Sequence, residues 1–476
     1  LVGWDQETYM PPRAQARRAE QLALLSELRH RRFTDPRMGE LLEALPEPEV
    51  RETLGEVAAA NVRETARSYR RATCLPSSFV AELTRVCAHA HEAWIEARKN
   101  ADFAQFAPHL ERIVALKREE ADRVGFEDER YDALLDVYEP GARTREIAPM
   151  LASLRERLVP IVQRVADGTE AQDGAEDGRR WPVEQQKQLC RRVAAAMGFD
   201  FEAGRLDESA HPFCSGIDVG DVRLTTRYDE RDAAGALFGV MHETGHGLYE
   251  QGLDPERFGT PAGEACSTGM HESQSRLWEN QIGRSRPFWE HFFPILCATF
   301  PQASEGLDLE SWVRRINRVR RSLIRVEADE VTYNLHILLR FELERDLLEQ
   351  RLAVADLPAA WNAKMEAYLG LTPPDDAQGV LQDIHWSFGG FGYFPTYTLG
   401  NLYAAQIHDA LRAAFPDLDD MLRHGRLLEI RDWLRDKIHR RGMVLRAPAL
   451  LEEVTGAPPS AEPFLRYIER KVEALA

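Results

Sequence analysis

Residues 233–251 read AAGALFGVMHETGHGLYEQ. The apolar residues of this stretch recur at helical spacing, which predicts a helix. Residues four apart lie on one face of a helix, so His242 and His246 can bind one metal ion from the same side. Glu243 is rotated by about 100° from His242, which makes it a poor third ligand but places its carboxylate where it can activate a water molecule. The pattern predicts a zinc hydrolase with Glu243 as the general base.

A chance match on a surface helix is the competing interpretation, because the pattern fixes only three positions. Gly245 argues against chance. Glycine lowers helix stability by about 1 kcal/mol relative to alanine, so a glycine inside the pattern requires a packing or access reason.

Zinc hydrolases need a third protein ligand and one open coordination position. The metzincin pattern would require Gly at position 249 and His at position 252, where this chain has Tyr and Gly, so that class is excluded. Glu250 shares the face of His246 but lies one turn further along, where it would reach past the ion. Glu272 lies far enough downstream to belong to a second helix over 271–281 that packs across the first. We therefore predict Glu272 as the third ligand, with Glu264 as the alternative.

Most of the remaining sequence also has helical periodicity. Strict alternation is rare, and the clearest strand candidate is 218–228, with Val222, Leu224 and Thr226 on one face. Glycines among acidic residues predict an exposed loop over 167–180. The sequence thus predicts a mainly α-helical fold, one domain over 1–476 with a few short strands near the metal helix. Amphipathic helices are predicted over residues 15–31, 51–71, 77–99, 144–165, 183–197, 309–348, 403–415 and 427–444.

Composition narrows the class of protein. The chain has 476 residues and a net charge of −18 at pH 7. Such an acidic surface repels phosphate backbones, so we expect no nucleic-acid partner. No apolar run approaches the roughly 18–20 residues that span a bilayer, so we expect no membrane association. None of the six cysteines is paired in C-x-x-C spacing, which favours a reducing, cytoplasmic compartment.

Six motifs stand in order along the chain: HPF (211–213), DVRLT (221–225), HETGH (242–246), HESQ (271–274), IRVEAD (324–329) and GVLQDIHW (379–386). Together they resemble the thermostable carboxypeptidase Taq family of metallocarboxypeptidases. The opening GWDQET (3–8) is similar as well, so the likeness covers essentially the whole chain. It implies that only a short N-terminal piece precedes Leu1.

The resemblance implies a mostly helical, saddle-like fold with a deep groove, usually a homodimer. It implies removal of single residues from the C-termini of peptides, with broad specificity. It also implies that His242, His246 and Glu272 are metal ligands and that Glu243 is the catalytic base. Zinc (Zn2+) is the expected ion, with cobalt (Co2+) as a substitute.

A carboxypeptidase must bind a terminal carboxylate, which arginine does best through its planar fork of donors. We predict this role for Arg325 and, second to it, for Arg223. Arg325 falls in the predicted helix over 309–348, where a solvated helix face is the competing interpretation. Arg223 lies on the predicted strand, where an ion pair with Asp221 is the competing interpretation.

Aromatic residues surround the glycine-rich stretch GGFG at 389–392. Such density usually means core packing, but a Tyr or His at a groove wall can donate a hydrogen bond to the oxyanion of a tetrahedral intermediate. We predict His385 and Tyr397 in this catalytic role, and Tyr393 as a substrate contact.

Other polar residues near the motifs are assigned weaker roles. His211 is expected to line the substrate pocket, with a structural histidine as the competing interpretation. His271 is expected to contact substrate or to support the metal site from outside the ligand set. Asp383 is expected to orient a metal-ligating histidine through its ring N–H. Cys214 and Cys266 are interpreted as small buried residues.

The sequence therefore predicts a zinc metallocarboxypeptidase that acts on peptides with a free C-terminus. An oligopeptidase or dipeptidyl carboxypeptidase would have the same metal centre and a different distance from the metal to the carboxylate-binding arginine. A helical binding protein with a vestigial metal site is the other alternative, but a structural site has no need of a base such as Glu243.

Overall fold

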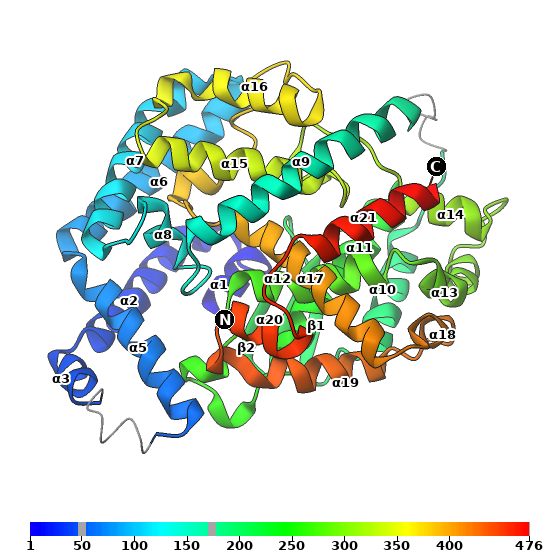
Figure 1. Ribbon diagram of the computed structural model, residues 1–476, viewed down its shortest axis with the longest axis horizontal. Coiled ribbons are helices and arrows are strands. Elements are labelled where there is room, and N and C mark those ends of the chain that lie inside the picture. Colours follow the sequence, from blue (N-terminus) through cyan, green and yellow to red (C-terminus); the bar gives the residue numbers. More distant parts are fainter. Residues whose placement is uncertain (46–53, 170–177, 476) are drawn as a thin grey trace. The chain divides into compact units, whose positions relative to one another are not determined.

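Helices dominate the computed structural model, which describes residues 1–45, 54–169 and 178–475 (Figure 1). This confirms the predicted mainly α-helical fold. The chain divides into two compact units, each built from three segments that are distant in sequence. The single-domain organisation stays a prediction. The first unit comprises Leu1–Thr73, Ala175–Ile316 and Ala404–Pro458, and the second comprises Cys74–Gly174, Asn317–Tyr403 and Pro459–Ala476.

The first unit contains the predicted metal site. Its strands are β1 (Gly204–Glu208), β2 (Cys214–Asp218) and β3 (Asp221–Thr226), and short helical turns are η1 (Pro12–Ala14), η3 (Pro255–Arg257), η4 (Pro261–Gly263), η5 (Leu277–Ile282) and η9 (His439–Val444). Its α-helices are α1 (Val2–Glu7), α2 (Gln15–Phe33), α3 (Pro36–Ala44), α5 (Glu56–Cys74), α10 (Val183–Met197), α11 (Ala233–Glu250), α12 (Thr268–Arg276), α13 (Arg286–Thr299), α14 (Leu309–Ile316), α18 (Leu418–Arg423), α19 (Leu428–Lys437) and α20 (Ala447–Thr455).

The strands form a small sheet in the order β1-β3-β2. β1 pairs with β3 in parallel, and β2 pairs with β3 antiparallel, with Cys214 opposite Leu224. Val222, Leu224 and Thr226, which were predicted to share one face, are buried, and Thr225 of the opposite face is buried as well. α11 packs against β3. Gly247 makes this contact close, because a Cβ at that position would lie 2.9 Å from the Leu224 side chain.

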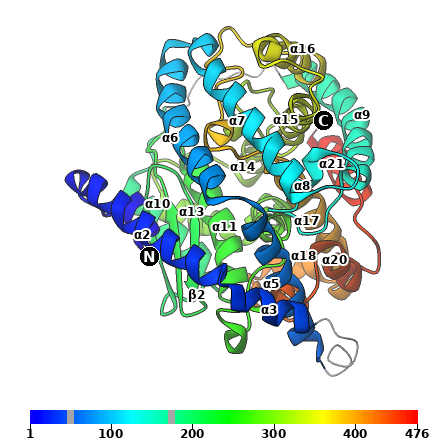
Figure 2. The same ribbon diagram turned by 90° about the vertical axis from the view of Figure 1, so that its left-hand side faces the viewer.

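In its described residues the second unit contains helices and turns but no β-strand. α6 and α7 lie side by side in both views (Figures 1 and 2), joined through Ala101 in the left-handed conformation (φ 52°). α17 (Pro395–Ala414) begins in this unit and ends in the first. The other elements are α6 (Ser77–Asn100), α7 (Phe103–Val124), α8 (Arg130–Leu135), α9 (Thr144–Thr169), α15 (Tyr333–Leu348), α16 (Leu357–Leu369), α21 (Glu462–Leu475) and the turns η6 (Arg325–Glu327), η7 (Val354–Asp356) and η8 (His385–Phe388).

The predicted continuous helix over 309–348 is wrong. α14 and α15 form its ends, but residues 317–332 between them are not α-helical. The reason is Asp329, whose carboxylate accepts hydrogen bonds from the backbone N–H groups of Arg320 (2.9 Å) and Val331 (2.9 Å). A side chain that binds the backbone in this way competes with helical hydrogen bonds. Arg325 consequently lies in the 3-10 turn η6 and is only 6% exposed, rather than on a solvated helix face.

Other boundaries also differ from the predictions, and the strand expected over 218–228 is the shorter β3. The helix expected over 403–415 begins earlier, as α17, and the helix expected over 427–444 divides into α19 and the 3-10 turn η9. Most of the loop expected over 167–180 lies outside the described residues, as do the first residues of the helix expected over 51–71. Within the described part of the chain, no helix combines the length and the apolar character needed to cross a bilayer.

Candidate active site

α12 crosses α11 at Gly245. A Cβ at Gly245 would lie 2.6 Å from the backbone oxygen of Gln274 and 2.6 Å from Cα of Ser275. No side chain fits at such distances, so glycine allows the two helix backbones to touch. This packing explains why a glycine stands inside the metal-binding pattern, and it brings Glu272 of α12 to the histidines of α11.

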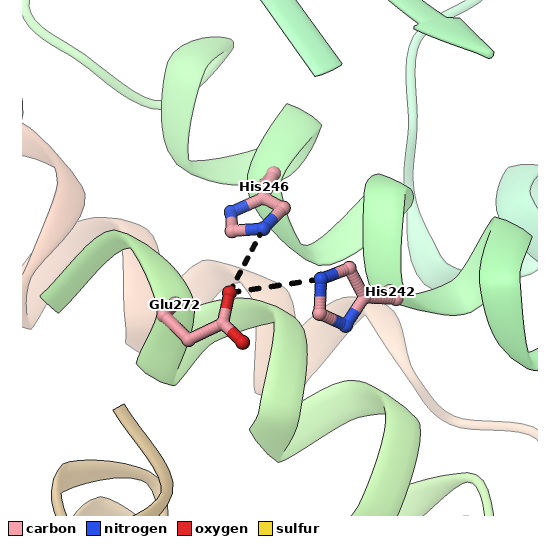
Figure 3. Close-up of side chains that lie close together, drawn as sticks. All are labelled: His242, His246 and Glu272. Carbon is pink, nitrogen blue, oxygen red and sulfur yellow. Dashed lines mark ion pairs between the residues drawn. The ribbon is translucent and has the colours of Figure 1, made fainter. Parts of the chain in front are cut away.

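His242, His246 and Glu272 point toward one another (Figure 3). Oε2 of Glu272 lies 3.6 Å from Nε2 of His242 and 3.3 Å from Nε2 of His246. Two ligand atoms bound to one tetrahedral zinc ion at about 2.0–2.1 Å are roughly 3.3 Å apart. The donor set therefore fits zinc, and three protein ligands are typical of a catalytic rather than a structural zinc site. Among the residues that the structure describes, no other group of histidine, cysteine and acidic side chains has this arrangement.

Glu279 of the π-helical turn η5 orients His242. Its Oε2 accepts a hydrogen bond from Nδ1 of His242 at 2.9 Å, which leaves Nε2 of the ring available to a metal. Arg276 and Arg284 approach the same carboxylate at 3.3 and 3.4 Å. Although burial opposes ionisation, Arg276 and the His242 hydrogen bond lower the pKa of Glu279 to about 2. The carboxylate is thus charged at neutral pH and fixes the His242 ring.

The role of Glu279 was not predicted from the sequence. Glu272, Arg276 and Glu279 are spaced i, i+4, i+7, so all three lie on one helix face, and this spacing could have identified them. The corresponding prediction for Asp383 is wrong. The Nδ1 atoms of the two ligand histidines are engaged by Glu279 and His271, and Asp383 pairs with arginines in the second unit.

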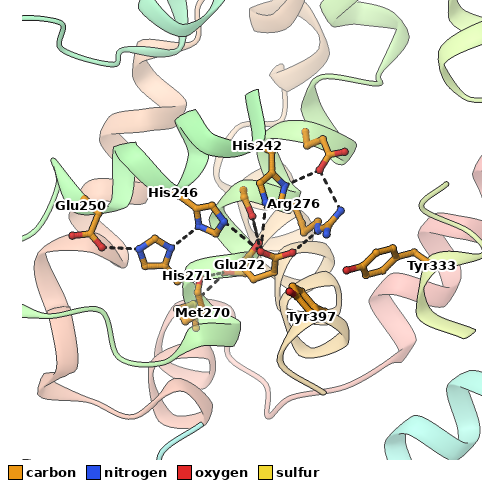
Figure 4. Close-up of polar contacts among 12 residues, drawn as sticks. His242, His246, Glu250, Met270, His271, Glu272, Arg276, Tyr333 and Tyr397 are labelled. Atoms are coloured by element: carbon orange, nitrogen blue, oxygen red, sulfur yellow. Dashed lines mark hydrogen bonds and ion pairs between the residues drawn. The ribbon is translucent and has the colours of Figure 1, made fainter. Parts of the chain in front are cut away.

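A second hydrogen-bonded relay orients His246 (Figure 4). Nδ1 of His246 lies 2.5 Å from Nδ1 of His271, and Nε2 of His271 lies 2.7 Å from Oε1 of Glu250. Because Nε2–H of His271 donates to Glu250, Nδ1 of the neutral His271 ring accepts a hydrogen bond from Nδ1–H of His246. The Nε2 lone pair of His246 is then directed to the metal site. Both ring nitrogens of His271 are used in this relay, an arrangement that favours support of the metal site over contact with substrate.

Replacing Glu250 with Gln is expected to weaken zinc binding about 10-fold, at the lower end of the range for changes behind a metal ligand. The amide can still accept from His271, but it lacks the charge that strengthens the relay. The measurement is the zinc dissociation constant, obtained by competition with a chelator. Glu256→Gln, which changes an exposed acid in η3, is the matched control. Equal zinc affinities for the two variants would contradict the relay.

Glu243 follows His242 in α11 and is not part of the group of side chains that could hold a metal ion. Its side chain is buried, with 6% of the residue exposed. Burial raises the pKa of Glu243 to about 7. A carboxylate with a pKa near the operating pH can both accept and return a proton, as a general acid–base requires.

In the second unit, Asp383 lies between two buried arginines. Its Oδ1 accepts hydrogen bonds from Nε (3.0 Å) and Nη2 (2.8 Å) of Arg325, and its Oδ2 accepts one from Nε of Arg340 (2.6 Å). Although burial opposes ionisation, the two guanidinium groups hold the pKa of Asp383 well below its usual range. Nη1 of Arg325 donates to Tyr333 at 2.9 Å. These contacts use three of the five N–H groups of Arg325, which leaves one on each Nη atom for a carboxylate.

His385, Tyr393 and Tyr397 lie together in the second unit. The Tyr397 hydroxyl is 3.4 Å from Nε2 of His385, and the ring of Tyr393 is 5.4 Å from that of His385 and 5.2 Å from that of Tyr397. Burial lowers the pKa of His385 to about 4, so its imidazole is neutral at physiological pH. The three residues can present a neutral imidazole and phenolic hydroxyls to a ligand.

The contacts of Arg223 in the structure are with other side chains of this protein. Its guanidinium forms a two-pronged ion pair with Asp221, at 2.7 and 2.9 Å, and lies over the Trp4 ring. This is the competing interpretation of the sequence. His211 is exposed, and Glu264 is also exposed and is not part of the metal-binding group.

Of the two cysteines expected to be buried, Cys266 is buried, whereas Cys214 is half-buried.

The whole chain matches known carboxypeptidases. Residues 1–472 match the family described as carboxypeptidase Taq (M32) metallopeptidase. The chain is 47% identical to thermostable carboxypeptidase 1 of Thermus thermophilus, covering 100% of this chain and 95% of that relative. It is 37% identical to carboxypeptidase 1 of Bacillus subtilis, covering 100% and 94%. The crystal structure of an M32 carboxypeptidase from Deinococcus radiodurans superposes with a TM-score of 0.95 at 40% identity, covering 100% of this chain and 95% of that one.

These matches extend over both units and leave no large segment unaccounted for. They imply a metal cofactor and peptide substrates, as the metal-binding geometry also indicates. The chain belongs to the carboxypeptidase Taq (M32) family and is a metallocarboxypeptidase, a peptide hydrolase.

Proposed function

We propose that this metallocarboxypeptidase uses zinc, with Glu243 as its general base, to remove single residues of many kinds from the C-termini of peptides. The observation that carries the proposal is the arrangement of His242, His246 and Glu272 at zinc-ligand separations, with a buried non-ligand carboxylate beside them. From the family resemblance we also propose a cytoplasmic homodimer, with Co2+ able to replace Zn2+.

A bound zinc ion would supply Lewis acidity, polarising a water molecule and the carbonyl of the last peptide bond. His242, His246 and Glu272 would hold it, and Glu279 and the His271–Glu250 relay keep the histidine rings in place. A Glu243 carboxylate oxygen takes a proton from the attacking water. The same oxygen then gives the proton to the nitrogen of the leaving amino acid.

Residues of the second unit supply the other proposed roles. Arg325 binds the terminal carboxylate of the peptide through the N–H groups that Asp383 and Tyr333 leave available. Neutral His385 and the Tyr397 hydroxyl donate hydrogen bonds to the oxyanion as charge develops on it. Tyr393 contacts the substrate. Arg223 is the second candidate for that carboxylate, because its ion pair with Asp221 uses only two of its five N–H groups.

The test is a mass-spectrometric time course on an N-terminally blocked peptide, compared with the same peptide carrying a C-terminal amide. The zinc-loaded protein should produce a ladder that loses one residue at a time from the free C-terminus. It should leave the amidated peptide intact, because amidation removes the charge that Arg325 binds. Two-residue steps would indicate a dipeptidyl carboxypeptidase. Internal fragments from both peptides would indicate an oligopeptidase, and no cleavage would indicate the non-catalytic binding protein.

A further inference from the structure

Glu344 of α15 is a fully buried carboxylate in the second unit. It accepts three hydrogen bonds from residues distant in sequence. Its Oε1 accepts from the indole Nε1 of Trp386 at 2.9 Å. Its Oε2 accepts from the Tyr131 hydroxyl at 2.8 Å and from the backbone N–H of Gly392 at 3.1 Å. None of the roles assigned above uses this group.

Two of these donors mark the ends of one turn, residues 385–392, which we call the glycine turn. Trp386 directly follows His385, and Gly392 directly precedes Tyr393. Gly392 has φ 88°, and a Cβ there would lie 2.7 Å from the backbone of Leu134, so only glycine fits. One carboxylate therefore holds both ends of the segment that bears His385 and leads into Tyr393.

Stability alone does not account for a charge at this position. Burial raises the pKa of Glu344 from its ordinary value of 4.5 to about 7. Between those two values the folded chain binds more protons at this group than the unfolded chain, so this group lowers folding stability as pH rises. A buried charge that lowers stability at neutral pH is explained better by what it positions than by what it stabilises.

We propose that Glu344 is a positioning residue for the carboxypeptidase reaction, and that it aligns His385 by fixing both ends of the glycine turn. This inference rests on the proposed role of His385 as an oxyanion donor. Glu344 itself touches no substrate and acts only through the turn.

The replacement Glu344→Gln tests the positioning role, because it changes which hydrogen bonds the side chain can accept. An amide has one acceptor oxygen and one donor NH2 group. If its oxygen takes the place of Oε1, the NH2 group faces the N–H of Gly392. If its oxygen takes the place of Oε2, the NH2 group faces the indole N–H of Trp386. Either orientation therefore releases one end of the glycine turn while the side-chain volume is unchanged.

Tyr131→Phe is the matched control. It removes the third donor to the same carboxylate, keeps the buried ring against Phe341, and leaves both bonds to the glycine turn intact. If Glu344 positions the turn, Glu344→Gln should lower kcat at least about 10-fold, because misplacement of a catalytic group by about 1 Å can cost up to 100-fold. KM should change less than kcat, because the oxyanion contact forms only in the transition state. Tyr131→Phe should keep kcat within about 2-fold of the parent chain.

A spectroscopic measurement reports on the turn without relying on activity. The protein is labelled with 5-fluorotryptophan, and the Trp386 resonance is assigned by its loss in Trp386→Phe. That resonance should shift or broaden in Glu344→Gln in either amide orientation, because the indole N–H loses either its acceptor or the charge on that acceptor. It should stay in place in Tyr131→Phe. The melting temperatures of both variants show that they are folded.

An unchanged kcat in Glu344→Gln with a displaced Trp386 resonance would overturn the positioning role. An unchanged resonance would contradict the hydrogen bond between Trp386 and Glu344. Equal losses of kcat in both variants would mean that Glu344 contributes only to general packing. If the parent zinc-loaded chain releases no C-terminal residue, the proposed function fails, and the resonance alone then decides whether Glu344 holds the turn.

Discussion

Glu243→Gln is expected to lower kcat by about 10²–10⁴-fold and to leave the zinc content at one ion per chain. The amide keeps the volume of the buried side chain but cannot take a proton from water. In the proposed centre Glu243 is outside the ligand set of His242, His246 and Glu272, so all three ligands remain and the zinc content at saturating metal should be unchanged. The measurements are steady-state kinetics on a blocked peptide and zinc content by elemental analysis.

The control for this variant is Glu256→Gln, at an exposed position with no role in the proposed chemistry. It should keep both activity and zinc. Loss of zinc together with activity in Glu243→Gln would contradict the assignment, because Glu243 would then be part of the metal site rather than the base beside it.

Asp383→Asn is expected to lower the free energy of unfolding by about 3–5 kcal/mol at neutral pH. The substitution leaves two buried guanidinium groups, those of Arg325 and Arg340, without a counter-charge. In the second unit it also weakens the hydrogen bonds that fix the Arg325 fork, so KM for peptides should rise. The measurement is urea unfolding followed by circular dichroism, together with KM on a blocked peptide.

The pH dependence of this loss has a definite sign. The folded-state pKa of Asp383 lies below its ordinary value of 3.8, so the carboxylate stabilises the fold at every pH above that value. The difference between the parent chain and Asp383→Asn should therefore be constant from neutral pH down to about pH 5, and should shrink only as the pH falls below 3.8. Asp346→Asn is the control, because its ion pair with Arg351 is exposed and should contribute at most about 1 kcal/mol. A loss of similar size in the two variants would contradict the buried-pair account.

The helix that bears His242 and His246 was predictable because its sequence pattern lies within one short stretch of the chain. The spacing of His242 and His246 fixes their common face, and Gly245 signals a close helix contact before the partner is known. The structure brings Glu272 to the two histidines as the crossing of α11 and α12 requires. Helical periodicity likewise predicts most helices, since a short stretch of sequence is enough to specify each amphipathic face.

The remaining features depend on contacts that the sequence does not reveal. The break between α14 and α15 contains no proline or glycine, and it arises from the bonds that Asp329 makes to the backbone. Because of that break, Arg325 is buried against Asp383, a partner far along the chain. The bonds of Glu344 to Tyr131, Trp386 and Gly392 likewise have no local signature. Such residues can be recognised only when the fold places their partners.

The most direct test of the zinc centre is a titration of the metal-free protein with zinc, followed by release of the C-terminal residue of a blocked peptide. The metal-free chain should be inactive. Activity should rise linearly with added zinc and reach its plateau at one zinc ion per chain. The activity of Glu272→Gln should not reach a plateau at one zinc ion per chain over the same zinc concentrations. Full activity without metal, or a parental titration curve for Glu272→Gln, would contradict the zinc centre of His242, His246 and Glu272.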